Sequence, residues 1–251
     1  MFAIEFRIKI SSMYSIRVPY SYQCARTYPL PAPSTIKGLC ANALWRVGGG
    51  NPVEHLKKVY EVSLGATSRA NQAIAVSSCT VNNLMWDAQL HKFKTNALLR
   101  QFAFTPYIDC MIAFKDDSEN LAERLRGAIK SAPVYLGDSE SLVSVLPQSV
   151  NTDVKISPVN KNNKVEINSL VKFDFIEKDS ISEKGVVLYM QDDPCSADAV
   201  LDRYFAPLKQ QGDFYSPIES FSFIASKNSF VIEGKRLKGI FCEKKKEEIE
   251  K

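Results

Sequence analysis

The chain has 251 residues, 45% of them hydrophobic and 24% charged, so it can bury a sizeable core and does not have a disordered composition. No window approaches the roughly 18 apolar residues of a membrane span, and charges stand where a signal peptide needs an apolar run. We therefore expect a soluble, cytoplasmic protein with no membrane partner. The six cysteines and two histidines lack the close spacing of zinc ligands, so we expect no metal and no cofactor.

The net charge of +4 is distributed unevenly along the chain. Residues 1–100 hold 12 Lys and Arg against 4 Asp and Glu, a net charge of +8, whereas residues 101–251 hold 20 against 24, a net charge of −4. A basic first segment indicates an anionic partner such as a nucleic acid. The alternative is that the asymmetry has no functional cause.

Residues 2–10 alternate apolar and charged side chains, which predicts a strand with one buried face and one solvated face. Residues 14–21 can continue as a second extended piece. Apolar residues then recur at helical spacing from residue 36 to 47, with Pro33 in the first turn, Ser34 or Thr35 as cap and a glycine run at the end. A second helix is predicted to begin at Asn51 and to run to about residue 60.

The segment 63–96 is polar and shows no steady period, so we read it as a long excursion that contains a hairpin. Residues 98–114 return to strand composition. Asp117 or Ser118 is then expected to cap a helix that Pro133 ends, and 134–145 predicts strand, turn and strand. This order matches a split βαβ, ferredoxin-like core of the α+β class, followed by a β-rich region at 151–242 and a charged tail at 243–251.

The sequence contains no nucleotide-binding or hydrolase motif, and carboxylates are scarce in the basic segment, which disfavours a two-metal site. His91 beside Lys92 is the remaining catalytic candidate. A metal-independent ribonuclease needs a general base and a cation, and this pair offers both. The alternative is a solvated basic loop that contacts phosphate, so we expect no catalytic residue.

Cations, aromatic rings and small polar groups in the first hundred residues supply the chemistry that RNA recognition uses. Lys37 and Arg46 are expected to be exposed on the first long helix, beside a rigid proline-rich corner. The candidate RNA-binding residues are Tyr14, Arg17, Tyr22, Arg26, Ser34, Thr35, Lys37, Arg46, Arg69, Asn71, Gln72, Trp86, His91, Lys92, Lys94 and Arg100.

Two stretches resemble a known family. "LPAPSTIKGLCANAL" looks like the proline-rich start of the first helix in CRISPR-associated protein 5, of the RAMP superfamily, and "VYLGDSESLVSV" is similar to that family's Y-L-G hairpin. The resemblance covers roughly residues 1–150. It implies a ferredoxin-like RAMP domain over 1–150, with a thumb-like insertion at about 67–96.

The resemblance also implies a role in antiviral defence. Such proteins hold the 5′ handle of the CRISPR RNA at one end of a type I surveillance (Cascade) complex, contact the backbone and large subunits, and meet target DNA indirectly. A minority branch cuts precursor RNA, for which His91 and Lys92 are the loose counterpart here. A protein-only assembly module is the third possibility.

Overall fold

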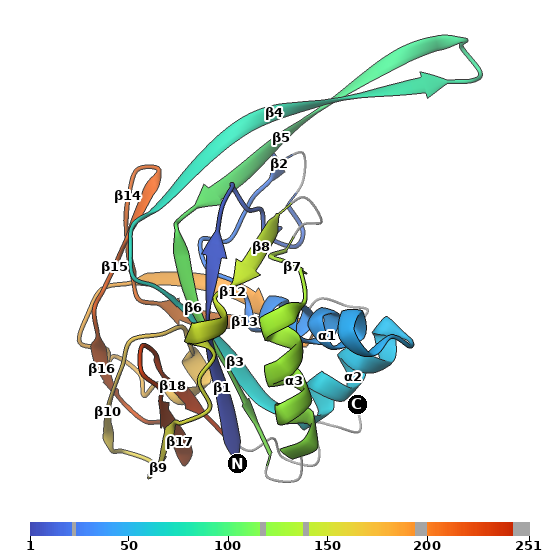
Figure 1. The fold of residues 1–251 in the computed structure, drawn as a ribbon. Coiled ribbons are helices and arrows are strands. Elements are labelled where there is room, and N and C mark those ends of the chain that lie inside the picture. The colour runs from blue at the N-terminus through green and yellow to red at the C-terminus, as the bar shows by residue number, and fades with distance from the viewer. Residues whose placement is uncertain (22–23, 116–118, 138–140, 194–199, 243–251) are drawn as a thin grey trace.

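The computed structural model describes residues 1–21, 24–115, 119–137, 141–193 and 200–242. Within these ranges the chain is a strand-rich mixed α/β protein, and its three α-helices lie together on one side (Figure 1). The predicted caps Asp117 and Ser118 and the predicted tail 243–251 lie outside the described residues. No described helix has both the length and the apolar character needed to cross a membrane.

The helices and strands have the following bounds. The helices are α1 (Pro33–Gly48), α2 (Pro52–Val62) and α3 (Glu119–Ser131). The strands of the first half are β1 (Phe2–Ile10), β2 (Cys24–Ala25), β3 (Ser63–Ala70), β4 (Ile74–Asp87), β5 (Lys92–Phe104), β6 (Tyr107–Phe114), β7 (Val134–Tyr135) and β8 (Leu142–Val145). The strands of the second half are β9 (Lys155–Val159), β10 (Lys164–Ile167), β11 (Val171–Lys172), β12 (Val186–Gln191), β13 (Leu201–Ala206), β14 (Leu208–Gln211), β15 (Phe214–Pro217), β16 (Phe221–Ile224), β17 (Ser229–Glu233) and β18 (Lys238–Phe241).

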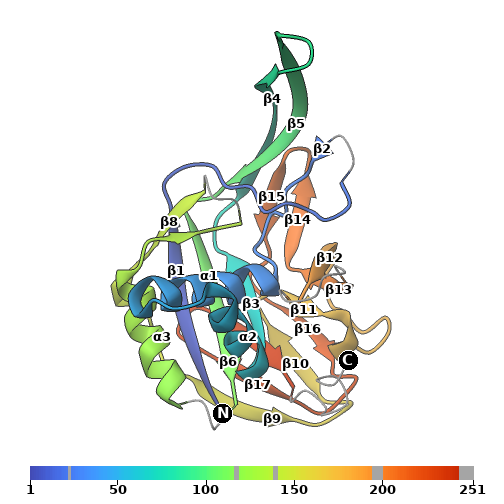
Figure 2. The same cartoon turned by 90° about the vertical axis from the view of Figure 1, so that its right-hand side faces the viewer.

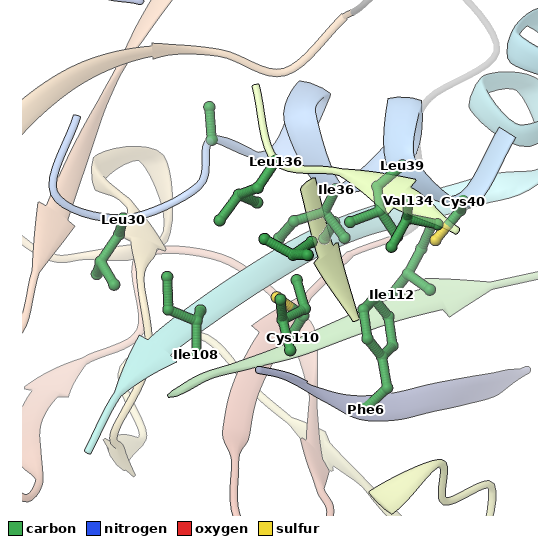
Figure 3. Packing of buried hydrophobic residues seen from close by; sticks show 14 of the residues in the cluster. Phe6, Leu30, Ile36, Leu39, Cys40, Ile108, Cys110, Ile112, Val134 and Leu136 are labelled. Atoms are coloured by element: carbon green, nitrogen blue, oxygen red, sulfur yellow. The ribbon is translucent and has the colours of Figure 1, made fainter. Parts of the chain in front are cut away.

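The central sheet has the order β3-β6-β1-β8-β7, and all neighbouring strands in it run antiparallel. The alternation in β1 decides which side chains face the helices: Ile4, Phe6 and Ile8 are completely buried against them. Figure 3 shows this core, in which Phe6 and Ile112 of the sheet lie below residues of α1 and of the segment around β7. The strand predicted at 2–10 is confirmed.

The other face of the central sheet is also covered along most of β1, which corrects the prediction of a solvated face; Lys9 near its end remains exposed. Ala3 and Glu5 are both 0% exposed, because β17, β18 and the turn between them cover this side. Ile232 and Phe241 pack there against β1 and its neighbours. The sheet is therefore the middle of three layers, with helices on one side and strands of the second half on the other (Figure 1).

The hairpin β4–β5 projects far from the three layers, as Figure 1 and Figure 2 both show. Its register runs without interruption from the Ala75↔Phe104 pair to the Asp87↔Lys92 pair. Near its base β15 pairs with β4, and β2 pairs in parallel with β5. The predicted excursion is thus two different things, because 63–70 forms the edge strand β3 of the central sheet and only the residues after it form the hairpin.

Helix α1 begins and ends where the prolines and glycines predict, but its N-cap is not the predicted one. Pro33 occupies the first turn and Ala32 is the N-cap, so Ser34 and Thr35 lie inside the helix and no side chain caps it. The helix ends at Gly48, where Gly49 adopts a φ of 67° and its N–H donates to the carbonyl of Trp45.

The proline-rich segment before α1 is held by side-chain hydroxyl groups from elsewhere in the fold. The Tyr14 hydroxyl donates to the carbonyl of Pro29 at 2.6 Å, and Ser68 Oγ donates to the carbonyl of Pro31 at 3.0 Å. Prolines fix the backbone angles, and these bonds fix the position of the segment against β3 and the loop after β1. The start of α1 is therefore a rigid corner.

Candidate nucleic-acid interface

A cavity of about 500 Å³ lies at the N-terminal end of α1, where the loop after β1, the base of β5 and the end of β12 meet. Four of the sixteen candidate RNA-binding residues, from three separate segments, line it: Arg17, Ser34, Thr35 and Arg100. The remaining lining residues are Ser15, Ile16, Pro19, Ala25, Tyr28, Ala32, Leu98, Gly137 and Gln191. The fold thus brings together candidate residues that are up to about eighty positions apart in the sequence, with Gln191 from still farther along the chain.

The start of α1 gives this cavity an affinity for anions. The first backbone N–H groups of a helix have no partner inside the helix, and the aligned peptide dipoles add a partial positive charge there. At α1 these groups belong to Ser34 and Thr35, no side chain caps them, and the first turn contains no acidic residue. Such an end binds phosphate oxygens well.

Two arginines add full positive charges to the same cavity. Arg17 is exposed in the loop after β1, where its backbone forms a bridge to Thr27. Arg100 lies on β5, and its guanidinium group stands 5.0 Å from the centre of the Phe102 ring. A guanidinium group has five N–H donors in a planar fork, which matches two oxygens of one phosphate. The lining therefore fits an RNA backbone better than it fits a neutral ligand.

The hairpin extends this cationic surface away from the body. Alternate residues of a strand share a face, so Lys92 and Lys94 near the tip lie on the same face of β5 as Arg100 in the cavity. Lys94 forms an ion pair with Asp87 across the hairpin. The opposite face carries the cross-strand pair of Trp86 and Phe93, whose rings meet edge to face at 5.1 Å while both remain more than half exposed.

Comparison with known proteins decides the family. A sequence profile described as "CRISPR-associated protein (Cas_Cas5)" matches residues 4–198. The chain belongs to the Cas5 family of CRISPR-associated proteins. The crystal structure of a CRISPR protein from Archaeoglobus fulgidus has a similar fold, with a TM-score of 0.60 and 13% identity over 97% of this chain and 100% of that chain.

One chain of a CRISPR RNA-guided surveillance complex is also similar. It matches with a TM-score of 0.48 and 14% identity, over 85% of this chain and 90% of that chain. No curated protein sequence matches the chain. Membership of the Cas5 family, expected from the two motifs, is thus confirmed by the profile match.

Two of the predicted contact residues of this Cas5-family protein, Tyr14 and Lys37, are buried, and the expectation that Lys37 is exposed is wrong. Tyr14 is 0% exposed, and its hydroxyl is bonded to the carbonyl of Pro29, so its ring belongs to the core. Lys37 is also 0% exposed, and its ammonium group forms an ion pair with Asp192. Helical spacing alone places Lys37 beside the apolar stripe, and strand β12 covers it.

Of the other predicted residues, Arg46 lies away from the cavity. Arg46 is near the far end of α1, roughly 18 Å along the helix from Ser34 at 1.5 Å per residue, and it stacks on the rings of Trp45 and Tyr135. Exposed Arg26 follows the cavity residue Ala25 in the chain, whereas Tyr22 lies outside the described residues.

Arg69 and Asn71, at the end of β3, line a different cavity, on the side of the sheet that the second half covers. Arg69 donates to the carbonyls of Arg236 and Glu219, and burial lowers the pKa of its guanidinium group. Asn71 donates to the carboxylate of Asp109 at 2.7 Å, and Gln72 is exposed beside it. The hydrogen bonds of Arg69 connect the two halves of the protein, whereas that of Asn71 lies within the first half.

The remaining candidates lie at the tip of the hairpin. His91 is exposed in its turn with a φ of 44°, and its ring centre is 6.5 Å from that of Trp86. Lys92 follows it and is exposed as well. The structure therefore separates this pair from the cavity at the base of β5.

Sequence reasoning missed two cavity residues, Tyr28 and Gln191, because nothing marks either as functional. Tyr28 follows the loop that carries Arg17, and its hydroxyl donates to the carbonyl of Tyr189. Gln191 ends β12, more than 150 residues later in the chain. Only the fold shows that the second half of the chain supplies part of this wall.

Burial of Tyr28 predicts a specific sensitivity to alkali. It raises the pKa of the phenol from 10.0 to about 12, so the folded state resists ionisation and the unfolded state does not. The stabilising effect is complete below pH 10 and is lost as the pH rises towards 12. We expect Tyr28→Phe to lose less stability than the wild type between these values, as measured by urea unfolding at each pH. An equal loss in both proteins would contradict the prediction.

Proposed function

We propose that this Cas5-family protein is a non-catalytic RNA-binding subunit of a type I CRISPR surveillance complex, in which it holds the 5′ handle of the CRISPR RNA. The observation that carries the proposal is the convergence of Arg17, Arg100 and the uncapped start of α1 on one cavity. These groups recognise phosphate by charge and by directed N–H donors, and phosphate contacts supply most of the affinity for RNA. Family membership supports the CRISPR setting.

The arrangement of the sheet supports a ferredoxin-like core for this role. In chain order its elements are β1, α1 with α2, β3, β6, α3 and the β7–β8 pair, and the spatial order β8-β1-β6-β3 is that of a split βαβ sheet. We propose that the β4–β5 hairpin is the thumb of this core. Its cationic face continues the cavity, so an RNA strand can follow it outward.

The tip of the hairpin supports contacts with neighbouring subunits. Leu84, Met85, Trp86, Leu90 and Phe93 are all more than half exposed there. An apolar cluster of this kind on a projecting element marks a place that a partner or a set of nucleobases covers. We propose that the backbone and large subunits of the complex meet the protein there and along its flanks, and that target DNA is reached only through them.

The non-catalytic part of the proposal rests on the chemistry of the cavity. Its described lining consists of arginines, small polar groups and apolar side chains, and none of these is a histidine or a carboxylate that would serve as general base. His91 and Lys92 lie instead at the tip of the hairpin. Mixing the protein with a repeat RNA hairpin without metal is expected to leave the RNA intact. Cleavage that His91→Ala abolishes would favour the ribonuclease alternative.

The RNA-binding role predicts how affinity and its salt dependence change together. Replacing both Arg17 and Arg100 by alanine is expected to weaken binding of a fluorescently labelled single-stranded repeat RNA by at least about tenfold, because two charge-assisted contacts are lost. The slope of log affinity against log salt concentration should also fall, by roughly 0.7 for each phosphate contact removed. Fluorescence anisotropy at several salt concentrations measures both.

Arg46→Ala is the matched control, since it removes an exposed arginine from the other end of the same helix and should leave affinity and slope nearly unchanged. Equal losses in the control and in the Arg17/Arg100 variant would show a diffuse electrostatic surface instead of a site. Recovery of an intact assembly after complete nuclease digestion would favour the protein-only alternative.

A further inference from the structure

The junction between the end of β12 and the start of α1 is held by two buried donors from the first half of the chain. Lys37 Nζ lies 2.7 Å from Asp192 Oδ1 and 3.1 Å from the carbonyl oxygen of Asp192. The Tyr28 hydroxyl donates to the carbonyl of Tyr189, three residues earlier. Met190, between these bonds, is 0% exposed in the core of the first half. The short segment 189–192 is therefore held at both ends against α1 and the chain just before it.

Gln191 is the residue of segment 189–192 that lines the cavity. It lies between the two anchored positions Tyr189 and Asp192 and lines the same wall as Thr35 and Arg100. Its Nε2 donates to the carbonyl of Asp193 at 2.6 Å, which occupies a donor of the amide. The side-chain carbonyl oxygen and the second N–H of the amide remain available to a ligand, and of these the oxygen is the hydrogen-bond acceptor.

We propose that Gln191 is the base-reading residue of the RNA cavity and that Lys37, through Asp192, is its positioning residue. The inference rests on the proposed function, because it requires RNA in the cavity. Arginines and helix N–H groups hold phosphates without regard to sequence, whereas an amide oxygen in a fixed position discriminates between bases. The second half of the chain thereby supplies the specificity of a site whose charge comes from the first half.

The chemistry of the acceptor identifies the class of nucleotide. Adenine carries an amino group at the position where guanine has a carbonyl oxygen, and cytosine carries one where uracil has a carbonyl oxygen. A fixed acceptor therefore favours adenine over guanine, or cytosine over uracil, at the nucleotide that it contacts. The opposite base would place two acceptors against each other and leave both without a donor.

Lys37 acts on the RNA only through position. Its side chain is fully buried and its ammonium group lies 5.0 Å from the centre of the Tyr60 ring, so it cannot reach a phosphate in the cavity. Without the ion pair, Asp192 would lose a contact that holds its side chain to α1, whereas β12 would keep its ladder with β13 and the bond from Tyr28. Gln191, the last residue of that ladder, would then be held less firmly, while Arg17 and Arg100 would keep their positions.

The test compares wild-type protein, Gln191→Ala, Lys37→Met and the double variant on a repeat RNA and on single-base versions of it, with A changed to G or C changed to U one position at a time. We expect the wild type to lose roughly tenfold or more in affinity at one position. Gln191→Ala should abolish this preference, Lys37→Met should weaken it, and the double variant should resemble Gln191→Ala alone. The salt slope should be unchanged in all, because no phosphate contact is lost.

Two further variants keep the test decisive. Lys238→Met removes a lysine on β18, which is paired to Glu233 at 3.5 Å and lies away from Asp192, and should leave the base preference intact. If Lys37→Met does not fold, Asp192→Asn keeps the bond from Lys37 to the main-chain oxygen of Asp192 and should weaken the preference partially.

Each remaining outcome overturns a definite part of the proposal. RNA binding with an unchanged preference in Gln191→Ala overturns the inference alone. A lost preference in Gln191→Ala with a normal one in Lys37→Met overturns the positioning role, and a reduced salt slope in Lys37→Met would mean that Lys37 contacts phosphate after all. Failure of the wild type to bind RNA would overturn the proposed function, and this inference with it.

Discussion

Glu5→Ala is expected to lower the free energy of unfolding by about 3–5 kcal/mol, because it removes a fully buried carboxylate from a charge network with Arg236 and Asp109. Glu5 is 0% exposed. Its carboxylate accepts hydrogen bonds from the backbone N–H groups of Lys235, Arg236 and Leu237 at 2.8–3.1 Å, and it lies 3.2 Å from the Arg236 guanidinium group. Alanine would leave the buried N–H group of Leu237 and the partly buried ones of Lys235 and Arg236 without this acceptor, and Arg236 with Asp109 as its remaining carboxylate partner.

Urea unfolding followed by circular dichroism measures the change, and Lys9→Ala is its matched control. Lys9 lies on the same strand and points to the same side, but it is exposed beyond the covering strands, so its removal should change stability by less than about 0.5 kcal/mol. Equal stability of Glu5→Ala and the wild type would mean that the turn between β17 and β18 is not anchored to the sheet.

The local elements of the fold could be predicted because each depends on neighbours in the sequence. Alternation in residues 2–10 predicted strand β1, and the prolines and glycines around 33–50 predicted the limits of α1. The Asn51 side chain caps α2 as expected, since its Oδ1 accepts from the N–H of Val53 at 2.9 Å. The alternating pattern could not show that strands from residues 229–241 would cover the second face of β1, because that depends on a partner about 230 residues away.

The sequence could predict the kinds of residue at the candidate site, but not which individual residues form it. Net charge and residue types in the first hundred positions indicated an anionic partner, and Arg17, Ser34, Thr35 and Arg100 do converge on one cavity. The same reasoning placed Lys37 on the surface, because a lysine on an otherwise amphipathic helix is usually solvated. Its ion pair with Asp192 of the second half could not be inferred from either segment alone.

The hairpin shows a similar limit. A polar segment without a steady period indicated an excursion over 63–96, yet β5 extends beyond it to Phe104, which pairs with Ala75 of β4. Residues 98–104 have strand composition, so the sequence favoured a separate strand in the core. Because β5 pairs with β4 through this whole stretch, Leu98 and Arg100 lie at the cavity, and the charge at the base of the hairpin becomes part of the site.

The Y-L-G stretch of the second motif leads to the other large effect, which is expected for Gly137→Ala. Gly137 has a φ of 82°, and a Cβ atom there would lie 2.6 Å from the carbonyl oxygen of Ser15 and 2.9 Å from Ile16 Cα. Rotation of a side chain can relieve neither the left-handed backbone angle nor the contact with main-chain atoms. Adding the strain to the overpacking, we expect a loss of roughly 2–4 kcal/mol in the free energy of unfolding.

This substitution also reports on the cavity, because Gly137, Ser15 and Ile16 all line it. A shift of the loop after β1 would move Arg17 away from the start of α1, so RNA affinity should fall in protein that is still folded at low temperature. Gly127→Ala is the control: Gly127 lies in α3 with open space at its Cβ position, and alanine there should raise stability by up to about 1 kcal/mol. An unchanged melting temperature and unchanged RNA affinity in Gly137→Ala would mean that the loop yields easily and that the cavity does not depend on its position.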